Sequence, residues 1–344
     1  MRSVNKQQFE MLPTTRSSVA LPDEWPLHHG GTITDGQLAY CLYGDVKLPC
    51  ILVLGGISAG RDVAHQTEQY ASGWWQQHIN YHGNIDLNKF CVLAVDYIGG
   101  NGDSSAPNRS FDPTDDAVST KDQAFAIAFL LEQLEIGKLL AAVGSSYGGN
   151  VVLSLCQHFP DRVANALVIS AADRSTPSAT ALRFIQRQII KQSSANTQPQ
   201  AVALARSLAM LSYRTSAELD RRFDGRTELS NRGLQAPIID YLNACGESFA
   251  ATFSADSFLR LSQSIDLHSV PPERIKPPLS LVAVDSDLLF PVSLIEELSE
   301  RTNANLTTIQ SNFGHDAFLK EDAKIGNLLR NFLTSCGCPS DSAR

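Results

Sequence analysis

The motif that points most directly to chemistry is GSSYG at 144–148, a serine flanked by glycines in the pattern G-x-S-x-G. A short apolar run precedes it at 139–143, and a helical run follows it at 150–158. In that context, a tight turn between strand and helix strains the central serine and exposes its hydroxyl above a sheet, and the close approach of strand and helix requires small flanking residues. The motif therefore predicts that Ser146 is a nucleophile. The alternative is an ordinary glycine-rich turn.

A serine at its free pKa is a poor nucleophile, so this prediction requires a histidine base and a carboxylate that orients it. Both occur later in the chain, in the order serine, acid, histidine. The acid is expected to be Asp287, in DSDLLFP at 285–291 after an apolar run, with Asp285 as the alternative. The base is expected to be His315, in GHDAFL at 314–319.

Two backbone amides are expected to stabilise the oxyanion that forms when the serine attacks. One is the N–H of Tyr147, at the helix N-terminus directly after the nucleophile. The other is the N–H of Ile57, in the turn GGISAG at 55–60. That turn lacks the G-K-[ST] of a phosphate-binding loop, and GGNGD at 99–103 does not match G-x-G-x-x-G, which disfavours an ATPase and a dinucleotide-binding enzyme.

Short apolar runs that alternate with helical stretches must position these residues. The alternation predicts an α/β fold in which a mostly parallel sheet, buried on both sides, carries helices on both faces. A helix is expected over 120–134, with Ser119 or Thr120 as its N-cap, and a hairpin over 32–43. The predicted parallel strands are 51–54, 91–96, 139–143, 166–169 and 279–284.

The alternation stops between residues 172 and 272, a stretch rich in helical patterns and arginine. We expect residues 31–171 and 273–335 to form one α/β core, with 172–272 inserted as a helical lid. Such an insertion would lie over the carboxyl ends of the strands, where open α/β sheets place their ligands. Residues 1–30 contain no signal-peptide core and are expected to be a flexible tail, as are residues 336–344.

The composition of the 344 residues fits a globular protein, because 43% are apolar and only 19% are charged. The net charge of −8 disfavours nucleic acid as a partner. No run of 18 apolar residues is present, so we expect no membrane span and a cytoplasmic protein. The first four of the seven cysteines lie in apolar runs and are expected to be buried thiols. Cys336 and Cys338 have no further ligand at metal spacing, so no metal is predicted.

Together, these motifs make the chain resemble the homoserine O-acyltransferases, enzymes of the α/β-hydrolase fold that acylate homoserine in methionine biosynthesis. The resemblance covers about residues 25–335. A generic esterase would share only the G-x-S-x-G turn, whereas the combination with the later stretches is specific. The stretches are GWW at 73–75, GGNGDSS at 99–105, GSSYGG at 144–149, ALARSLAMLSYRTSAEL at 203–219, DSDLLFP at 285–291 and GHDAFL at 314–319.

The resemblance implies the same nucleophile, acid and base, and it adds two residues that bind the substrate. It places Arg206 at the carboxylate of homoserine and Asp316 at the amino group. A zwitterionic amino acid needs one cation and one anion, and arginine can hold a carboxylate through two parallel hydrogen bonds. One alternative is that Arg206 is a solvated residue, since Arg214 lies on the same segment. The other is that Asp316 serves only as a charge at a helix N-terminus.

One departure concerns the acyl donor. Where acetyl-transferring members of the family carry a His-Ala-Leu-Thr-Gly turn, this chain has GGISAGRDV at 55–63, which resembles the homoserine O-succinyltransferases of some gammaproteobacteria. GGNGDSS and SQSIDLH at 262–268 share this resemblance. The resemblance therefore favours succinyl-CoA over acetyl-CoA, with L-homoserine as the acceptor. Arg61 is the candidate cation for the additional carboxylate of the succinyl group.

The implied reaction is a ping-pong transfer in which Ser146 takes the acyl group from acyl-CoA and homoserine then takes it from the acyl-enzyme. Acyl-CoA is a co-substrate, and no metal or tightly bound cofactor is implied. Three alternatives stay open: a homoserine O-acetyltransferase using acetyl-CoA, a serine esterase or thioesterase, and a binding protein on a catalytically idle scaffold. Serine as the acceptor also stays open, as does a homodimer, for which no segment identifies an interface.

Overall fold

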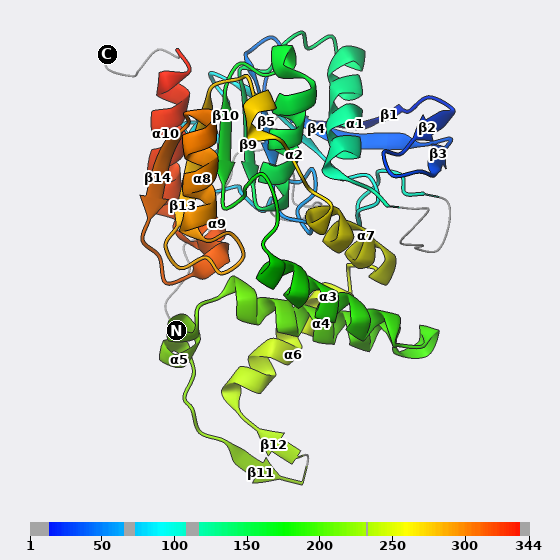
Figure 1. Ribbon diagram of the computed structural model, residues 1–344, viewed down its shortest axis with the longest axis vertical. Coiled ribbons are helices and arrows are strands. Elements are labelled where there is room, and N and C mark those ends of the chain that lie inside the picture. Colours follow the sequence, from blue (N-terminus) through cyan, green and yellow to red (C-terminus); the bar gives the residue numbers. More distant parts are fainter. Residues whose placement is uncertain (1–13, 65–72, 108–116, 232, 338–344) are drawn as a thin grey trace.

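The computed structural model describes residues 14–64, 73–107, 117–231 and 233–337. Eight strands form the central sheet: β1 (Thr14–Ala20), β4 (Gln37–Tyr43), β5 (Cys50–Leu54), β8 (Cys91–Val95), β9 (Ala141–Ser145), β10 (Ala166–Ile169), β13 (Leu279–Val284) and β14 (Asn305–Ile309). Their order is β1-β4-β8-β5-β9-β10-β13-β14, and all neighbours are parallel except β1–β4 and β4–β8 (Figure 1). The prediction of a mostly parallel sheet is confirmed.

The sheet is buried on both faces because residues along each strand alternate between two hydrophobic cores. In β5, Leu52 and Leu54 belong to one core, whereas Ile51 and Val53 belong to the other. Helices α1, α2 and α8 supply apolar side chains to the first core, and α9 and α10 supply them to the second. These helices are α1 (Thr120–Gln133), α2 (Tyr147–His158), α8 (Val292–Thr302), α9 (Ala317–Lys320) and α10 (Asp322–Ser335).

Local signals explain where the predicted elements begin. Ser119 is the N-cap of α1: it accepts from the Asp122 amide, and the Asp122 carboxylate in turn accepts from the Ser119 amide. The predicted strand 139–143 is displaced towards its carboxyl end, because Leu139 makes only an isolated bridge with Val163. The other four predicted parallel strands agree with β5, β8, β10 and β13 to within one residue.

Two expectations about the first 43 residues are wrong. Within the expected tail 1–30, β1 pairs along its whole length with β4, and β2 (Glu24–Pro26) pairs with β3 (Thr32–Thr34). The hairpin expected over 32–43 does not form, because β3 and β4 pair with different strands. Residues 1–13 and 338–344, and with them Cys338, lie outside the described residues.

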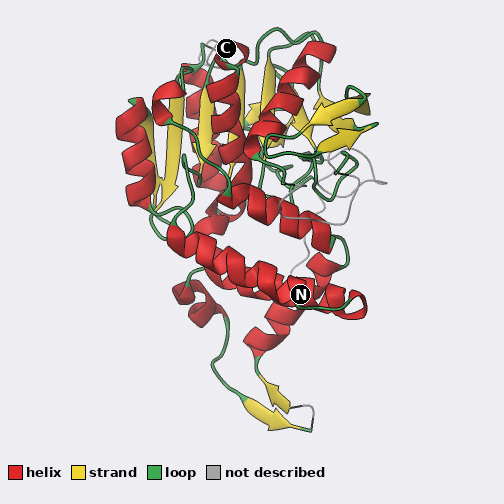
Figure 2. Ribbon diagram, turned by 45° about the vertical axis from the view of Figure 1, so that its right-hand side comes forward, coloured by secondary structure: helices red, strands yellow, loops and turns green. Residues whose placement is uncertain are grey.

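Residues 172–272, here called the helical segment, lie at the carboxyl ends of the strands (Figures 1 and 2). The segment also contains a hairpin of β11 (Glu228–Ser230) and β12 (Gly233–Gln235), which projects away from the sheet and which the sequence does not predict. Its helices are α3 (Pro177–Lys191), α4 (Gln198–Tyr213), α5 (Ser216–Arg222), α6 (Pro237–Ala250) and α7 (Ala255–Asp266). The remaining strands, β6 (Ile79–Asn80) and β7 (Ile85–Asp86), pair with each other. No helix in the described part of the chain has the length and hydropathy needed to span a membrane.

His268 fixes the end of the helical segment to the core. Its buried ring accepts a hydrogen bond at Nδ1 from the Thr120 hydroxyl (2.8 Å) and donates from Nε2 to the Ala172 carbonyl (3.1 Å). Burial lowers the pKa of His268 to about 3, against the opposing effect of the Ala172 hydrogen bond, so the ring is neutral. Beside it, the Val270 amide donates to the Asp173 carbonyl (3.0 Å), so the two ends of the segment are adjacent.

The substitution His268→Ala should lower the free energy of unfolding by about 1–3 kcal/mol or more, since it removes the partners of a buried hydroxyl and a buried carbonyl. Urea denaturation followed by circular dichroism measures this loss. The control His29→Ala, at an exposed position, should change the free energy of unfolding by less than about 0.5 kcal/mol. Equal unfolding midpoints for the two variants would contradict the role of His268.

Candidate active site

Ser146 lies at the sharp turn between β9 and α2. Its φ of 54° and ψ of −125° are rarely adopted by residues that carry a side chain. A Cβ on Gly144 would lie 2.3 Å from the carbonyl oxygen of Gly148, and a Cβ on Gly148 would lie 2.5 Å from the backbone of Leu54. The predicted need for small residues at these two positions is therefore confirmed, and the turn brings the serine to the carboxyl edge of the sheet.

The structure brings Ser146, His315 and Asp287 together. The Ser146 Oγ lies 2.7 Å from Nε2 of His315, and Nδ1 of His315 lies 2.7 Å from Oδ2 of Asp287. With Nδ1–H donating to the carboxylate, Nε2 is left unprotonated and can accept the serine proton. The three side chains lie in the segments that follow β9, β13 and β14, and the parallel sheet places the carboxyl ends of these strands at one edge.

Asp287, rather than the alternative Asp285, is bonded to the histidine. The Oδ1 of Asp287 accepts from the amides of Leu289 (2.8 Å) and Phe290 (3.1 Å), which fixes the carboxylate behind the ring. Asp285 instead accepts from the Ser311 amide (3.0 Å), beyond the end of β14. Both carboxylates follow β13, but only one of them is directed at the imidazole.

His315 is buried, with 4% of its surface exposed, and the rings of Phe290 and Tyr213 lie 5.7 and 5.8 Å from it, centre to centre. Burial opposes protonation of His315, but the charge of Asp287 and its hydrogen bond outweigh that effect. The net result raises the pKa of His315 above its ordinary value of 6.5. The base is therefore held in a partly apolar site by a carboxylate that favours its charged form.

The amides expected to form the oxyanion site lie next to the serine. Ile57 and Tyr147 both line the same cavity as Ser146. The amide of Tyr147 is the first of helix α2, where amides have no acceptor within the helix. Neither amide donates to another backbone group in the described part of the chain. Both are therefore free to bind a negatively charged oxygen.

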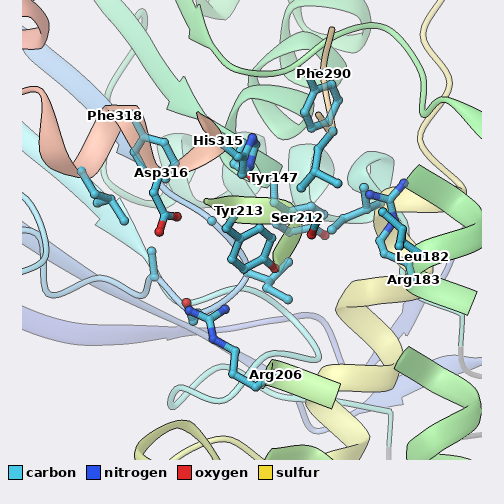
Figure 3. Close-up of a pocket in the computed structure, with 18 of the residues that line it drawn as sticks. Tyr147, Leu182, Arg183, Arg206, Ser212, Tyr213, Phe290, His315, Asp316 and Phe318 are labelled. Atoms are coloured by element: carbon cyan, nitrogen blue, oxygen red, sulfur yellow. Dashed lines mark hydrogen bonds between the residues drawn. The ribbon is translucent and has the colours of Figure 1, made fainter. Parts of the chain in front are cut away.

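The cavity that contains Ser146 and His315 has about 910 Å³ of space not filled by atoms, a volume that includes open solvent. The core contributes the loop after β5 and the residues around His315, and the helical segment contributes residues of α3, α4 and α7 (Figure 3). Most of the lining is apolar, including Trp74, Leu182 and Phe290. The cavity is therefore a place where charges on a ligand interact strongly with the few charged side chains present.

Arg206 and Asp316 line this cavity and point towards one another (Figure 3). The guanidinium of Arg206 lies over the rings of Tyr213 (5.0 Å) and Phe249 (4.8 Å), which hold it by cation–π contact. Burial raises the pKa of Asp316, although His315, Arg206 and Arg214 oppose this rise. Arg214, the other arginine of the 203–219 stretch, lies 3.5 Å from Asp316 and is bound to Glu218. The cavity thus offers a cation and an anion side by side.

The expectation that Arg61 receives a ligand carboxylate is wrong. Its side chain is buried, forms ion pairs with Asp96 (3.3 Å) and Asp103, and is not among the residues that line the cavity. Its backbone amide also donates to Asp96 (2.8 Å). A buried guanidinium needs carboxylate partners, and Arg61 has a buried one in Asp96 and an exposed one in Asp103.

Arg183 and Gln186 on α3 also line the cavity, and no sequence motif predicts them as site residues. Arg183 is one of several arginines in the helical segment, and its sequence context does not distinguish it from the others. Their spacing of three residues does place both side chains on one face of α3, which is a signal present in the sequence. That pattern alone does not tell a ligand site from a polar helix face.

The family model described as "alpha/beta hydrolase fold" matches residues 49–322. A homoserine O-succinyltransferase of Xanthomonas campestris pv. campestris is 37% identical over 317 residues, which span 91% of this chain and 82% of that protein. A serine O-succinyltransferase of the same species is 27% identical and spans 95% of this chain and 100% of its own. Among solved structures, esterase E22 has a TM-score of 0.84 at 18% identity, covering 93% of this chain and 100% of its own, which shows a shared fold.

The substitution Asp287→Asn should slow the labelling of Ser146 by a fluorophosphonate about 10³- to 10⁴-fold. The asparagine amide would donate to Nδ1 of His315, so the ring proton would move to Nε2 and block proton transfer from the serine. The rate of labelling, followed by intact-protein mass spectrometry, measures this effect. The matched control is Asp285→Asn, which should change the rate by less than about threefold. A similar loss in both variants would contradict the assignment of Asp287.

The same labelling rate should fall as the pH decreases through the raised pKa of His315, because the protonated ring cannot accept the serine proton. The midpoint of this fall should therefore lie above 6.5, the ordinary value for histidine. The rate of Ser146 labelling, measured at a series of pH values, gives this midpoint. A midpoint at or below 6.5 would show that Asp287 does not dominate the environment of the base.

Proposed function

Because this chain belongs to the homoserine O-acyltransferase family of the α/β-hydrolase fold, we propose that it transfers an acyl group from acyl-CoA to the hydroxyl of L-homoserine, with succinyl-CoA as the donor. The main support is that Arg206 and Asp316 line the same cavity as Ser146 and His315, with Asp287 bonded to His315 behind it. A hydrolase requires only the first group. The second group suits a zwitterionic acceptor.

In the first half-reaction, His315 takes the proton of Ser146 as the serine oxygen attacks the thioester carbonyl. The amides of Ile57 and Tyr147 stabilise the negative charge on the carbonyl oxygen. As the tetrahedral intermediate collapses, the carbon–sulfur bond breaks and CoA leaves as the thiol, with the proton that His315 returns. Asp287 stabilises the imidazolium while it carries that proton. The product of this stage is an acyl ester on Ser146.

In the second half-reaction, homoserine occupies the space that CoA has left. Arg206 binds its carboxylate and Asp316 binds its ammonium group, which directs the hydroxyl towards the ester and His315. His315 takes the hydroxyl proton as the oxygen attacks, and it returns the proton to Ser146 as the ester bond breaks. The enzyme is regenerated and O-acylhomoserine is released. This order makes the reaction ping-pong.

Water is the competing acceptor, because hydrolysis would use the same base and the same acyl ester. The helical segment supplies part of the apolar lining, including Leu182, Tyr213 and Ile265, which limits the water near Ser146. The shared fold with an esterase means that the fold itself does not select transfer over hydrolysis. The selection must come from the acceptor site at Arg206 and Asp316.

One sequence feature and the names of two relatives support succinyl-CoA as the donor. The turn GGISAGRDV at 55–63 differs from that of the acetyl-transferring members, and the two relatives described above are both succinyltransferases by name. Their names differ in the acceptor, homoserine for one and serine for the other. O-succinylhomoserine would enter methionine biosynthesis, and the enzyme would act in the cytoplasm, where acyl-CoA is found. The proposed chemistry uses no metal and no tightly bound cofactor.

Release of CoA thiol by the purified protein tests this proposal. With succinyl-CoA, homoserine should raise the rate at least roughly tenfold over that in water alone, and kcat/KM should rank succinyl-CoA above acetyl-CoA and homoserine above serine. The control Ser146→Ala should lose transfer at least about 10³-fold. Equal rates with and without homoserine would favour a thioesterase, and full activity of Ser146→Ala would exclude a covalent mechanism.

A further inference from the structure

Helix α3 presents two buried polar side chains to the cavity, and the mechanism above uses neither. Arg183 is 6% exposed and Gln186 is 4% exposed, and both line the cavity that contains Ser146. Within the described residues, Arg183 donates from Nε and Nη2, and no hydrogen bond is formed by its Nη1 or by the Gln186 amide. Neither group is among the fully enclosed unsatisfied atoms, so both remain accessible from the cavity. Buried groups of this kind are normally satisfied by protein, water or a ligand. Because Arg183 and Gln186 line the cavity that contains Ser146, a ligand in that cavity can be their partner.

Arg183 belongs to a cluster with excess positive charge. Its Nε donates to Oδ1 of Asp266 (2.8 Å), and its Nη2 donates to the Ser175 hydroxyl (2.8 Å). Arg187, one turn further along α3, forms an ion pair with Oδ2 of the same Asp266 (2.7 Å). Two guanidinium groups therefore share one carboxylate. A buried cluster with one net positive charge is stabilised by an additional anion.

Figure 3 shows Arg183 on one side of the cavity and Arg206 with Asp316 on the other, with His315 and Tyr213 between them. Of the arginine and lysine residues in the described part of the chain, Arg183 and Arg206 are the two that line the cavity. In the proposed reaction, Arg206 is occupied by the carboxylate of the acceptor. A second carboxylate in the same cavity would therefore need the other cation.

We infer that Arg183 and Gln186 bind the distal carboxylate of a dicarboxylic acyl group, such as succinyl, while its other end is esterified to Ser146. This inference rests on the proposed function and names residues that select the donor. Nη1 of Arg183 donates to one carboxylate oxygen and Nε2 of Gln186 to the other. An acyl chain without the carboxylate leaves both donors and the excess charge unsatisfied, which disfavours it. Arg183 and Gln186 thus take the role that the sequence assigned to Arg61, whose side chain is paired with Asp96.

The test compares succinyl-CoA with butyryl-CoA, whose acyl chain has the same number of carbons but ends in a methyl group. Gln186→Leu should lower kcat/KM for succinyl-CoA roughly ten- to hundredfold, the effect of losing a hydrogen bond to a charged group. It should change kcat/KM for butyryl-CoA by less than about threefold, and it should leave the KM for homoserine unchanged. The ratio between the two donors is therefore the readout.

Gln188→Leu is the matched control, the same replacement on α3 at a residue that does not line the cavity. Arg183→Lys is the second variant, because it keeps a positive charge near Asp266 but lacks the guanidinium fork, and it should lower the donor ratio as Gln186→Leu does. An unchanged ratio in both cavity variants, or a raised KM for homoserine with the ratio unchanged, would overturn the inference while the proposed function stands. Absence of homoserine-dependent CoA release in the unmodified protein would overturn both.

Discussion

The close approach of helix α2 to the sheet is the constraint on which the site depends. Gly148 lies so close to the backbone of Leu54 that no side chain fits between them, and Gly144 lies equally close to Gly148. Ser146 has its strained backbone conformation between these two glycines, and the Gly148 amide donates to the Gly55 carbonyl (2.8 Å), which places the start of α2 beside the loop after β5. The nucleophile, one oxyanion donor and the neighbouring loop are therefore set by one packing contact, and a single Cβ would disturb all three.

Charges in the cavity are few and are separated by function. The Asp287 side chain is fully buried behind His315, is bonded to the ring and to the Leu289 and Phe290 amides, and does not line the cavity. Arg206 and Asp316 form a dipolar pair on one side, and the Arg183–Arg187–Asp266 cluster lies on the other. Because the remaining lining is largely apolar, each charged group keeps most of its electrostatic strength. The arrangement suits a reaction in which two differently charged substrates meet at one serine.

Local sequence patterns predicted the parts of the structure that depend on local backbone chemistry. The turn at Ser146, the N-cap expected at Ser119 or Thr120 and the buried strands all have a mechanism that acts over a few residues. Long-range contacts decided the rest. Asp287 was the expected acid and Asp285 the alternative, and the choice is settled by the bond from His315 to Asp287 and by the bond from the Ser311 amide to Asp285. The ion pairs of Arg61 are equally invisible in sequence. The polar strand β1 exists because β4 offers an open edge, which composition does not reveal.

The two ends of the helical segment enter and leave the core at adjacent positions, joined by the hydrogen bond from Val270 to Asp173 and by the neutral ring of His268. An insertion with adjacent ends leaves the path of the core chain unchanged. Evolution can therefore replace or remodel the residues above the serine without reordering a single strand below it. Substrate choice and bond-breaking chemistry can in this way diversify independently within one chain.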